Sequence, residues 1–324
     1  MTKSKKRDVI RGIVGVSILL TLPAFISGYY VYLIRLVGVY AILALGLNVF
    51  MGLAGQINLG NAAFFCIGAY TSAILQVKLG WHYIPSFPVA IMFSFLAAWG
   101  MSYPLLRLRG HSLAIGSLAF AIAVYLMADR FRDLTGGEDG MQVPTMNLFG
   151  QSMEGTFYYY LIIFFVVVTY IFCYFLADSR IGLALRAIGE NEEGAGASGI
   201  DILHYKRVAW LISGVFGGLA GALYSQQAGF LSPPTFALWT NINTLTILVV
   251  GGLGLNFGVI IGSMIMTLLP HLLAGLESLV LLINGLILFF VLRFMPAGIL
   301  GTAIKIYGKS EHSKEILEMP SQTS

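Results

Sequence analysis

The chain has 324 residues and a net charge of +4, and 57% of its residues are hydrophobic while only 10% are charged. Soluble domains carry about 25% charged residues, so this supply could not cover a soluble surface, and disordered, collagen-like and coiled-coil chains are excluded as well. No basic stripe with interleaved aromatic residues indicates a nucleic-acid partner, and the apolar runs do not alternate as in a membrane β-barrel.

The apolar runs instead predict an all-α, polytopic membrane protein with about ten spanning helices, some of them broken or re-entrant. Each run is close to the roughly 20 residues that cross a hydrocarbon core. The runs are 12–28, 31–51, 57–77, 86–106, 111–128, 157–177, 208–228, 238–255, 257–275 and 277–294. They define a membrane domain at 12–300 in the lipid bilayer, between tails at 1–11 and 301–324. The basic start also fits a signal peptide, but we favour a first span because further runs follow at once.

Lysine and arginine segregate to one side of this arrangement. If the chain starts in the cytoplasm, all but four of the 19 fall in cytoplasmic segments, as the positive-inside rule requires. The exceptions are Arg35, Lys78, Arg130 and Arg132. Both termini are then cytoplasmic, the loop at 129–156 is external, and the loop at 178–207 is cytoplasmic. Five runs precede the external loop and five follow it, so the two halves could form an inverted repeat.

Four amide side chains lie among glycines in the stretch 46–71. They are Asn48, Gln56, Asn58 and Asn61. Glycine allows a helix to break, and a broken backbone at membrane depth is tolerated only inside protein or beside water. The amides are therefore candidates to line a path for a polar solute. The alternative is that they join helices around a tight turn at Gly52 to Gln56.

The loop at 178–207 carries charges of both signs and contains good helix formers from Ile181 to Ile188. A loop of this length between neighbouring spans usually has a function of its own. We expect a short helix on the membrane surface that fits a cytoplasmic partner, with a plain solvated connection as the alternative. In the second half, glycines four residues apart predict close helix packing. These pairs are Gly214 and Gly218, Gly217 and Gly221, Gly254 and Gly258, and Gly258 and Gly262.

The sequence carries no recognisable means of supplying energy. No acidic residue lies in the middle of a predicted span, which argues against proton coupling. The string at Gly308 to Ser310 resembles part of a phosphate loop, but Ala303 stands where that loop needs glycine. No metal-binding or nucleophile motif occurs, so we expect no enzyme activity, no metal and no cofactor. The remaining classes are a transport subunit driven by partners, a stand-alone secondary carrier or channel, and a structural scaffold.

Seven stretches resemble the permease subunits of branched-chain amino acid ABC importers of the LivM type. The stretches are GLNVFMGLAGQINLGNAAFFCIGAYT at 46–71, LRGHSLAIGSLAFAI at 108–122, LTGGEDGM at 134–141, RIGLALRAIGENEEGAGASGID at 180–201, SGVFGGLAGALYS at 213–225, VVGGLGLNFGVIIG at 249–262 and NGLILFFVLRFMPAGILG at 284–301. Together they cover most of the chain in order, so the combination is specific for this family although each piece alone is not.

The resemblance implies a permease in the cell (inner) membrane that pairs with a second, related permease. Two cytoplasmic ATPase subunits would bind the ATP, and an external solute-binding protein would deliver the solute. Importers of this class carry a coupling segment of the form Glu-Ala-Ala, three residues, Gly. Its spacing places ATPase coupling at Glu192, Glu193, Ala195 and Gly199, with Gly194 in place of the first alanine. Each glycine there weakens a helix by about 1 kcal/mol relative to alanine.

The resemblance also implies the class of solute, without naming one. Relatives carry branched-chain or other neutral amino acids, and others carry urea or short amides. The few charges along the predicted path suit a neutral or zwitterionic solute. The binding protein largely sets the choice, and whether two copies of one permease or two different permeases pair stays open.

Overall fold

The computed structural model describes residues 23, 27–148, 151–152, 155–272, 277–295 and 298–302. Its helices are α2 (Gly28–Leu47), α3 (Asn61–Val77), α4 (Tyr83–Leu105), α5 (His111–Arg130), α6 (Arg132–Thr135), α7 (Thr156–Asp178), α8 (Arg180–Glu190), α9 (Glu192–Ala197), α10 (Ile202–Ala228), α11 (Leu238–Gly251), α12 (Asn256–Leu272) and α13 (Glu277–Phe294). Shorter elements are the π-helical turn η2 (Asn48–Leu53), the 3₁₀ turns η3 (Gly137–Asp139) and η4 (Pro233–Phe236), and the strands β1 (Met141–Gln142), β2 (Asn147–Leu148), β3 (Gln151–Ser152) and β4 (Phe230–Leu231).

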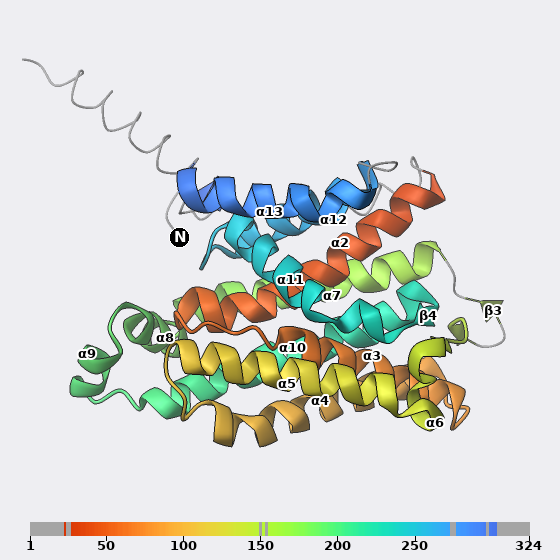
Figure 1. The fold of residues 1–324 in the computed structure, drawn as a ribbon, viewed down its shortest axis with the longest axis horizontal. Helices are drawn as coiled ribbons and strands as arrows, with labels where there is room; N and C mark the ends of the chain where they lie inside the picture. Colours follow the sequence, from red (N-terminus) through yellow and green to blue (C-terminus); the bar gives the residue numbers. More distant parts are fainter. Residues whose placement is uncertain are drawn as a thin grey trace, which may run out of the picture.

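The long helices run along the long axis of the molecule, and two kinds of connection mark its two ends (Figure 1). One end carries α8 and α9, and we call it the α8/α9 end. The other carries α6 and the strands, and we call it the strand end. There β1 pairs antiparallel with β4, opposing Met141 to Leu231, so the loop after α5 is joined to the loop after α10.

The predicted all-α membrane architecture is confirmed. Within the described residues, five helices are long and apolar enough to cross a membrane: α2 continued by η2, α4, α5, α7 and α10. The apolar helices α3 and α12 are shorter. In chain order, the predicted runs from 31–51 onward overlap α2 with η2, α3, α4, α5, α7, α10, α11, α12 and α13. The run at 12–28 lies almost wholly outside the described residues. The inverted repeat stays a prediction.

Helix α10 lies at the centre of the bundle and packs against α2, α3 and α4. The long helices differ in the share of buried residues in their most apolar 18-residue stretch. This share is 72% in α10 and 78% in α2 with η2, but only 22% in α4 and 28% in α5. The indole of Trp210 is fully buried on α10, and its N–H donates to the Ala98 carbonyl at 2.9 Å. Its ring meets Phe50 and Phe64 edge-on, so one side chain joins three neighbouring segments.

Two glycine pairs allow α10 to approach its neighbours closely. Gly214 and Gly218 face α4, whereas Gly217 and Gly221 face α3. A Cβ atom on Gly217 would lie only 2.6 Å from the Cβ of Phe64, closer than real carbon contacts. The close packing predicted from their four-residue spacing is confirmed, and it uses two different faces of the helix.

Candidate functional site

Helix α2 breaks within the glycine-rich stretch. Helix α2 continues into η2, the chain turns at Gly55, and an extended segment leads to α3. Gly55 has a φ of +64°, which favours glycine because a Cβ atom is strained in that region. The Gln56 N–H donates to the Phe50 carbonyl at 3.3 Å and closes the predicted turn. Helix α3 therefore begins at Asn61, four residues later than the apolar run at 57–77.

Asn48 joins this break to a second one, between α11 and α12. Its Nδ2 donates to Oδ1 of Asn256 at 2.9 Å, and its Oδ1 accepts from the Gly254 N–H at 2.9 Å. The side chain is buried. Asn48 thus satisfies a backbone donor that the second break leaves outside any helix, which is a structural task.

Asn61 and Gln56 also have partners within the protein. The Nδ2 of Asn61 donates to the Leu43 carbonyl on α2 at 3.1 Å, and its Oδ1 accepts from the Ser213 hydroxyl on α10 at 3.0 Å. Gln56 is half-buried and donates to the nearby Ala54 carbonyl at 3.2 Å. Asn61 therefore anchors the start of α3 to two neighbouring helices.

Asn58 differs from the other three predicted path residues. Its Oδ1 accepts from the Gly60 N–H at 2.7 Å, and its Nδ2 is buried with no acceptor among the described residues. Asn241 on α11, which the sequence analysis missed, behaves in the same way. Its Oδ1 accepts from the Ala62 N–H at 2.8 Å, and its Nδ2 is likewise buried without an acceptor. The signal that could have found it is an asparagine near the start of the apolar run at 238–255, where Asn241 and Asn243 both lie.

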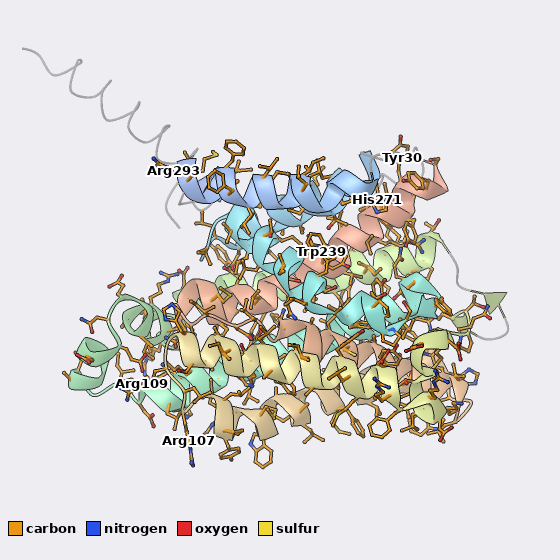
Figure 2. The ribbon with its side chains drawn as sticks, in the orientation of Figure 1. Tyr30, Arg107, Arg109, Trp239, His271 and Arg293 are labelled. Carbon is orange, nitrogen blue, oxygen red and sulfur yellow. The ribbon has the colours of Figure 1, made fainter. Side chains whose placement is uncertain are left out.

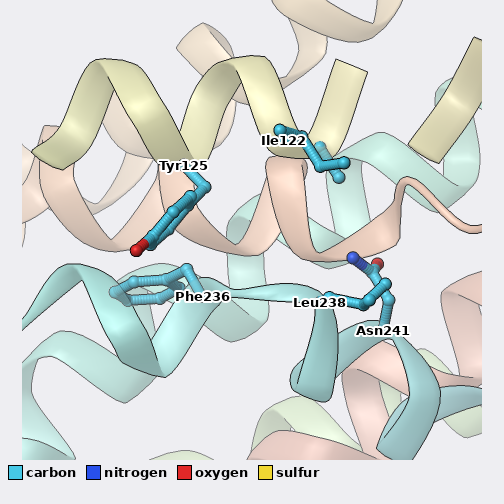
Figure 3. Close-up of a pocket in the computed structure, with 6 residues that line it drawn as sticks. Ile122, Tyr125, Phe236, Leu238 and Asn241 are labelled. Carbon is cyan, nitrogen blue, oxygen red and sulfur yellow. The ribbon is translucent and has the colours of Figure 1, made fainter. Parts of the chain in front are cut away.

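A small pocket lies beside Asn241, between α5, η4 and α11 (Figure 3). Its lining residues are Ala121, Ile122, Tyr125, Phe236, Leu238 and Asn241. Its volume of about 20 Å³ is enough for one water molecule, which needs about 10–15 Å³. Figure 3 shows the Asn241 amide directed from α11 toward Ile122 of α5. The pocket thus combines mostly apolar walls with one buried amide.

A larger groove of about 500 Å³ lies between α3, α4 and α5. Its walls are almost wholly apolar, with Tyr70, Thr71 and Thr135 supplying the hydroxyl groups. An open groove of this composition at the edge of a membrane bundle suits a hydrocarbon chain better than a polar solute.

The predicted coupling loop forms helices because side chains cap each one. The Ser179 hydroxyl accepts from the Gly182 N–H at 3.2 Å to begin α8. The Asn191 Oδ1 accepts from the Gly194 N–H at 2.9 Å to begin α9. Asp201 accepts from the His204 N–H at 3.0 Å, so α10 begins at Ile202, six residues before the apolar run that starts at 208. The helix expected from Ile181 to Ile188 is confirmed as part of α8.

The four predicted coupling residues lie on α9 or just after it, in different environments. Glu192 pairs with Lys206 of α10, with 2.7 Å between Oε2 and Nζ. Glu193 is exposed, Ala195 is buried, and Gly199 follows the helix with a φ of +83°. Glu192 therefore fixes α9 to the bundle, while Glu193 presents its carboxylate to the surroundings.

Helix α8 rests directly on the break that follows α2 and η2. A Cβ atom on Gly189 would lie 2.7 Å from the Leu53 carbonyl oxygen, and one on Gly55 would lie 3.0 Å from the Gly189 Cα. Backbone touches backbone here, so the α8–α9 segment and the amide-rich break are in contact. No group of three or more His, Cys, Asp or Glu side chains in the described part of the chain is placed to hold a metal ion.

Figure 2 labels side chains that lie at the two ends of the molecule. Arg107, Arg109 and Arg293 lie at the α8/α9 end, and Tyr30 and His271 lie at the opposite end. The sequence analysis placed these three arginines on the same side as the loop at 178–207, and the structure brings them there.

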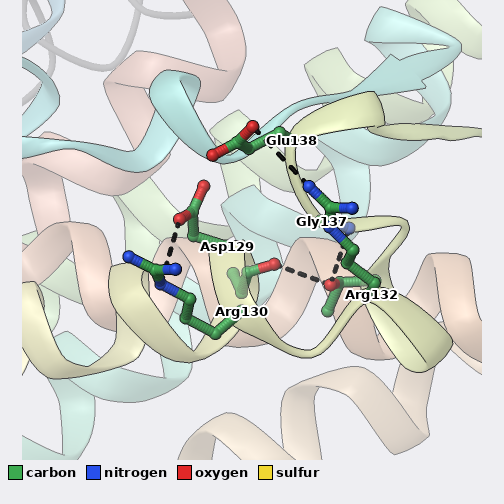
Figure 4. A network of polar contacts seen from close by, with 7 residues as sticks. Asp129, Arg130, Arg132, Gly137 and Glu138 are labelled. Atoms are coloured by element: carbon green, nitrogen blue, oxygen red, sulfur yellow. Dashed lines mark hydrogen bonds and ion pairs between the residues drawn. The ribbon is translucent and has the colours of Figure 1, made fainter.

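The loop after α5 is folded by a local polar network at the strand end (Figure 4). The Thr135 hydroxyl donates to the Ala128 carbonyl at 2.6 Å and accepts from the Gly137 N–H at 3.2 Å. Arg132 lies 3.8 Å from Glu138, and both side chains are well exposed. Exposed pairs of this kind contribute at most about 1 kcal/mol, so the buried Thr135 contacts fix the loop.

The family and three relatives that match this chain are all described as permeases of branched-chain amino acid transport systems. The family described as the permease component of branched-chain amino acid transport systems matches residues 29–292. The high-affinity branched-chain amino acid transport system permease protein LivM of Escherichia coli (strain K12) is 30% identical over 303 residues, covering 86% of this chain and 71% of the relative. LivH of the same organism is 25% identical over 282 residues, covering 81% and 91%. BraD of Pseudomonas aeruginosa is 27% identical over 283 residues, also covering 81% and 91%. No solved structure matches.

Proposed function

The chain belongs to the permease-component family of branched-chain amino acid transport systems, and on that premise we propose that it is the membrane permease subunit of an ATP-driven importer of branched-chain amino acids. The observation that carries this function is the match over residues 29–292, which includes both the broken helix and the α8–α9 segment. The chain itself is a multi-pass membrane protein without a recognisable phosphate loop, so ATP would be bound by partner subunits.

The proposed partners are a second permease, two ATPase subunits and an external binding protein. LivM and LivH of one organism are both similar to this chain and both named as permease proteins of the high-affinity system. This similarity supports a pair of two different, related permeases. The α8/α9 end, with its arginines and its exposed Glu193, would face the cytoplasm and the ATPases. The strand end would face the binding protein.

The proposed mechanism passes through the contact between α8 and the break. ATP binding would move the ATPases, and Glu193 would transmit that movement to α9. Because α8 touches Leu53 and Gly55, the movement would reach the segment that carries Asn58. Nucleotide would thus shift the populations of two conformations with access from opposite sides.

The function is tested by leucine uptake into vesicles that contain the assembled importer. We expect ATP-dependent accumulation that disappears when this chain or the ATPase subunits are omitted. Accumulation by this chain alone would identify a secondary carrier instead. ATP-dependent uptake of urea or short amides without leucine would keep the importer class and replace the solute.

A further inference from the structure

Two buried amides at the start of α3 are oriented by backbone donors. Since a peptide N–H can only donate, Gly60 and Ala62 must each face an oxygen, and they face the Oδ1 atoms of Asn58 and Asn241. The NH₂ group of each amide is therefore directed away from the helix backbone. The orientation of both amides follows from the hydrogen-bond network and leaves two donors for another group.

Both donors are deeply buried. Asn58 is 1% exposed and Asn241 is 3% exposed, and neither Nδ2 atom has an acceptor within the described residues. Buried polar groups in folded proteins nearly always have partners, because an unpaired buried donor costs free energy. Asn48 and Asn61 show that this same region can satisfy its amides fully.

The surroundings favour an anion with an apolar part. The 17-residue helix α3 begins here after the extended segment, so the positive end of its dipole lies beside the two amides. The pocket that Asn241 lines is walled by Ile122, Phe236 and Leu238 (Figure 3). Helix starts inside membrane transporters point toward anionic groups of substrates in the same way.

We propose that the start of α3 is a subsite for the carboxylate of the transported amino acid, bound by Nδ2 of Asn58 and Nδ2 of Asn241. The aliphatic side chain of that amino acid packs against Ile122, Phe236 and Leu238. This inference rests on the proposed function for its choice of ligand. The pocket holds about 20 Å³ in this conformation, so α5 and α11 separate when the subsite is occupied.

The test measures binding to the full-length chain in lipid vesicles, apart from transport. Photo-leucine, which carries a diazirine on its side chain, is cross-linked by light, and the labelled peptides are identified by mass spectrometry. We expect labels within 121–125 and 236–242. Isocaproate, which keeps the carboxylate and lacks the ammonium, should compete with the label, whereas isopentylamine, which lacks the carboxylate, should not.

Asn241→Asp and Asn58→Asp replace the donor that the proposal uses with an oxygen. Each aspartate still accepts from its backbone N–H, so the start of α3 stays capped, but the NH₂ group becomes an oxygen that repels a carboxylate. We expect labelling to fall by about tenfold or more in either variant, as for loss of a hydrogen bond to a charged group. Asn243→Asp adds the same charge to α11 outside the pocket lining and should keep most of the labelling.

Three results would overturn the subsite: labels confined to other segments, equal competition by isopentylamine, or unchanged labelling in both aspartate variants. If one variant fails to insert into vesicles, the other decides the question together with the competition. Leucine uptake by the unmodified importer is measured separately. If the importer takes up leucine but labelling is unchanged in the variants, only the proposed subsite is refuted. If labelling depends on the carboxylate but the importer takes up no leucine, only the proposed importer function is refuted.

Discussion

Asn48 and Asn256 lie 208 positions apart in the chain, and their side-chain amides share a hydrogen bond of 2.9 Å. The two residues border two helix breaks. Asn48 lies in η2, before the break that leads to α3, and Asn256 begins α12, after the break that follows α11. The same Asn48 side chain accepts from the Gly254 N–H, so the two breaks are held as one unit.

Asn48→Ala should therefore destabilise the protein. It removes two hydrogen bonds and leaves the Gly254 N–H without its acceptor, at a cost of about 2 kcal/mol. Thermal unfolding in detergent would show a lower midpoint. Gln56→Ala is the matched control, because Gln56 is half-buried and makes one local bond of 3.2 Å. Equal midpoints for the two variants would mean that the Asn48 contacts do not hold the breaks together.

The ion pair between Glu192 and Lys206 should respond asymmetrically to mutation. The Lys206 side chain is 3% exposed and Glu192 is 28% exposed. Glu192→Gln leaves a buried ammonium without its carboxylate, whereas Lys206→Met leaves a carboxylate that water can reach. We expect Glu192→Gln to cost about 2 kcal/mol more than Lys206→Met, after allowance for the partial exposure of the pair. Chemical unfolding in detergent measures the free energy of unfolding of each variant. A larger loss for Lys206→Met than for Glu192→Gln would contradict the conclusion that Lys206 is the more deeply buried partner.

Glu193→Ala should separate ATP hydrolysis from transport. The side chain is exposed on α9, so the change should alter stability by no more than about 0.5 kcal/mol. We expect leucine uptake per ATP hydrolysed to fall while the importer still assembles. Glu190→Ala, at another exposed acidic position in the same segment, is the control. Unchanged coupling in vesicles would show that Glu193 does not contact the ATPase subunits.

Local sequence patterns predicted the features that are set by residues close together in the chain, such as helices, turns and close-packed helix faces. The glycine pairs on α10 follow from a four-residue spacing, and α8 follows from a run of helix formers between a cap and a glycine-rich segment. The turn at Gly52 to Gln56 belonged to the alternative in which the amides join helices, and Gly55 permits the positive φ that this reversal requires.

The roles of the amides could not be predicted, since they depend on which distant segments meet. Composition makes Asn48, Asn58 and Asn61 equivalent, yet only Asn58 keeps a donor without an acceptor in the described structure. Asn241 lies 179 positions from Ala62, and no local pattern joins them. Hydrophobic periodicity predicts where the helices lie in the sequence but does not predict which of them pack against one another.

The contact between α8 and the first break leads to the last prediction. Gly189→Ala adds a methyl group where a Cβ would lie 2.7 Å from the Leu53 carbonyl oxygen. Because backbone atoms cannot move aside like a flexible side chain, α8 must shift away from the break. We expect ATP-dependent leucine uptake to fall several-fold while the ATPase subunits still copurify, as for other substitutions that overpack a tight contact.

Gly194→Ala on α9 is the matched control for this substitution. Its added Cβ would have its nearest neighbour at 3.4 Å, an ordinary contact with the Asn191 side chain. The same glycine-to-alanine change should therefore strengthen α9 by about 1 kcal/mol and preserve uptake. If Gly189→Ala also preserves uptake, α8 does not transmit its movement through Leu53 and Gly55. In that case the ion pair between Glu192 and Lys206 is another direct connection that could carry movement from α9 to the long helix α10.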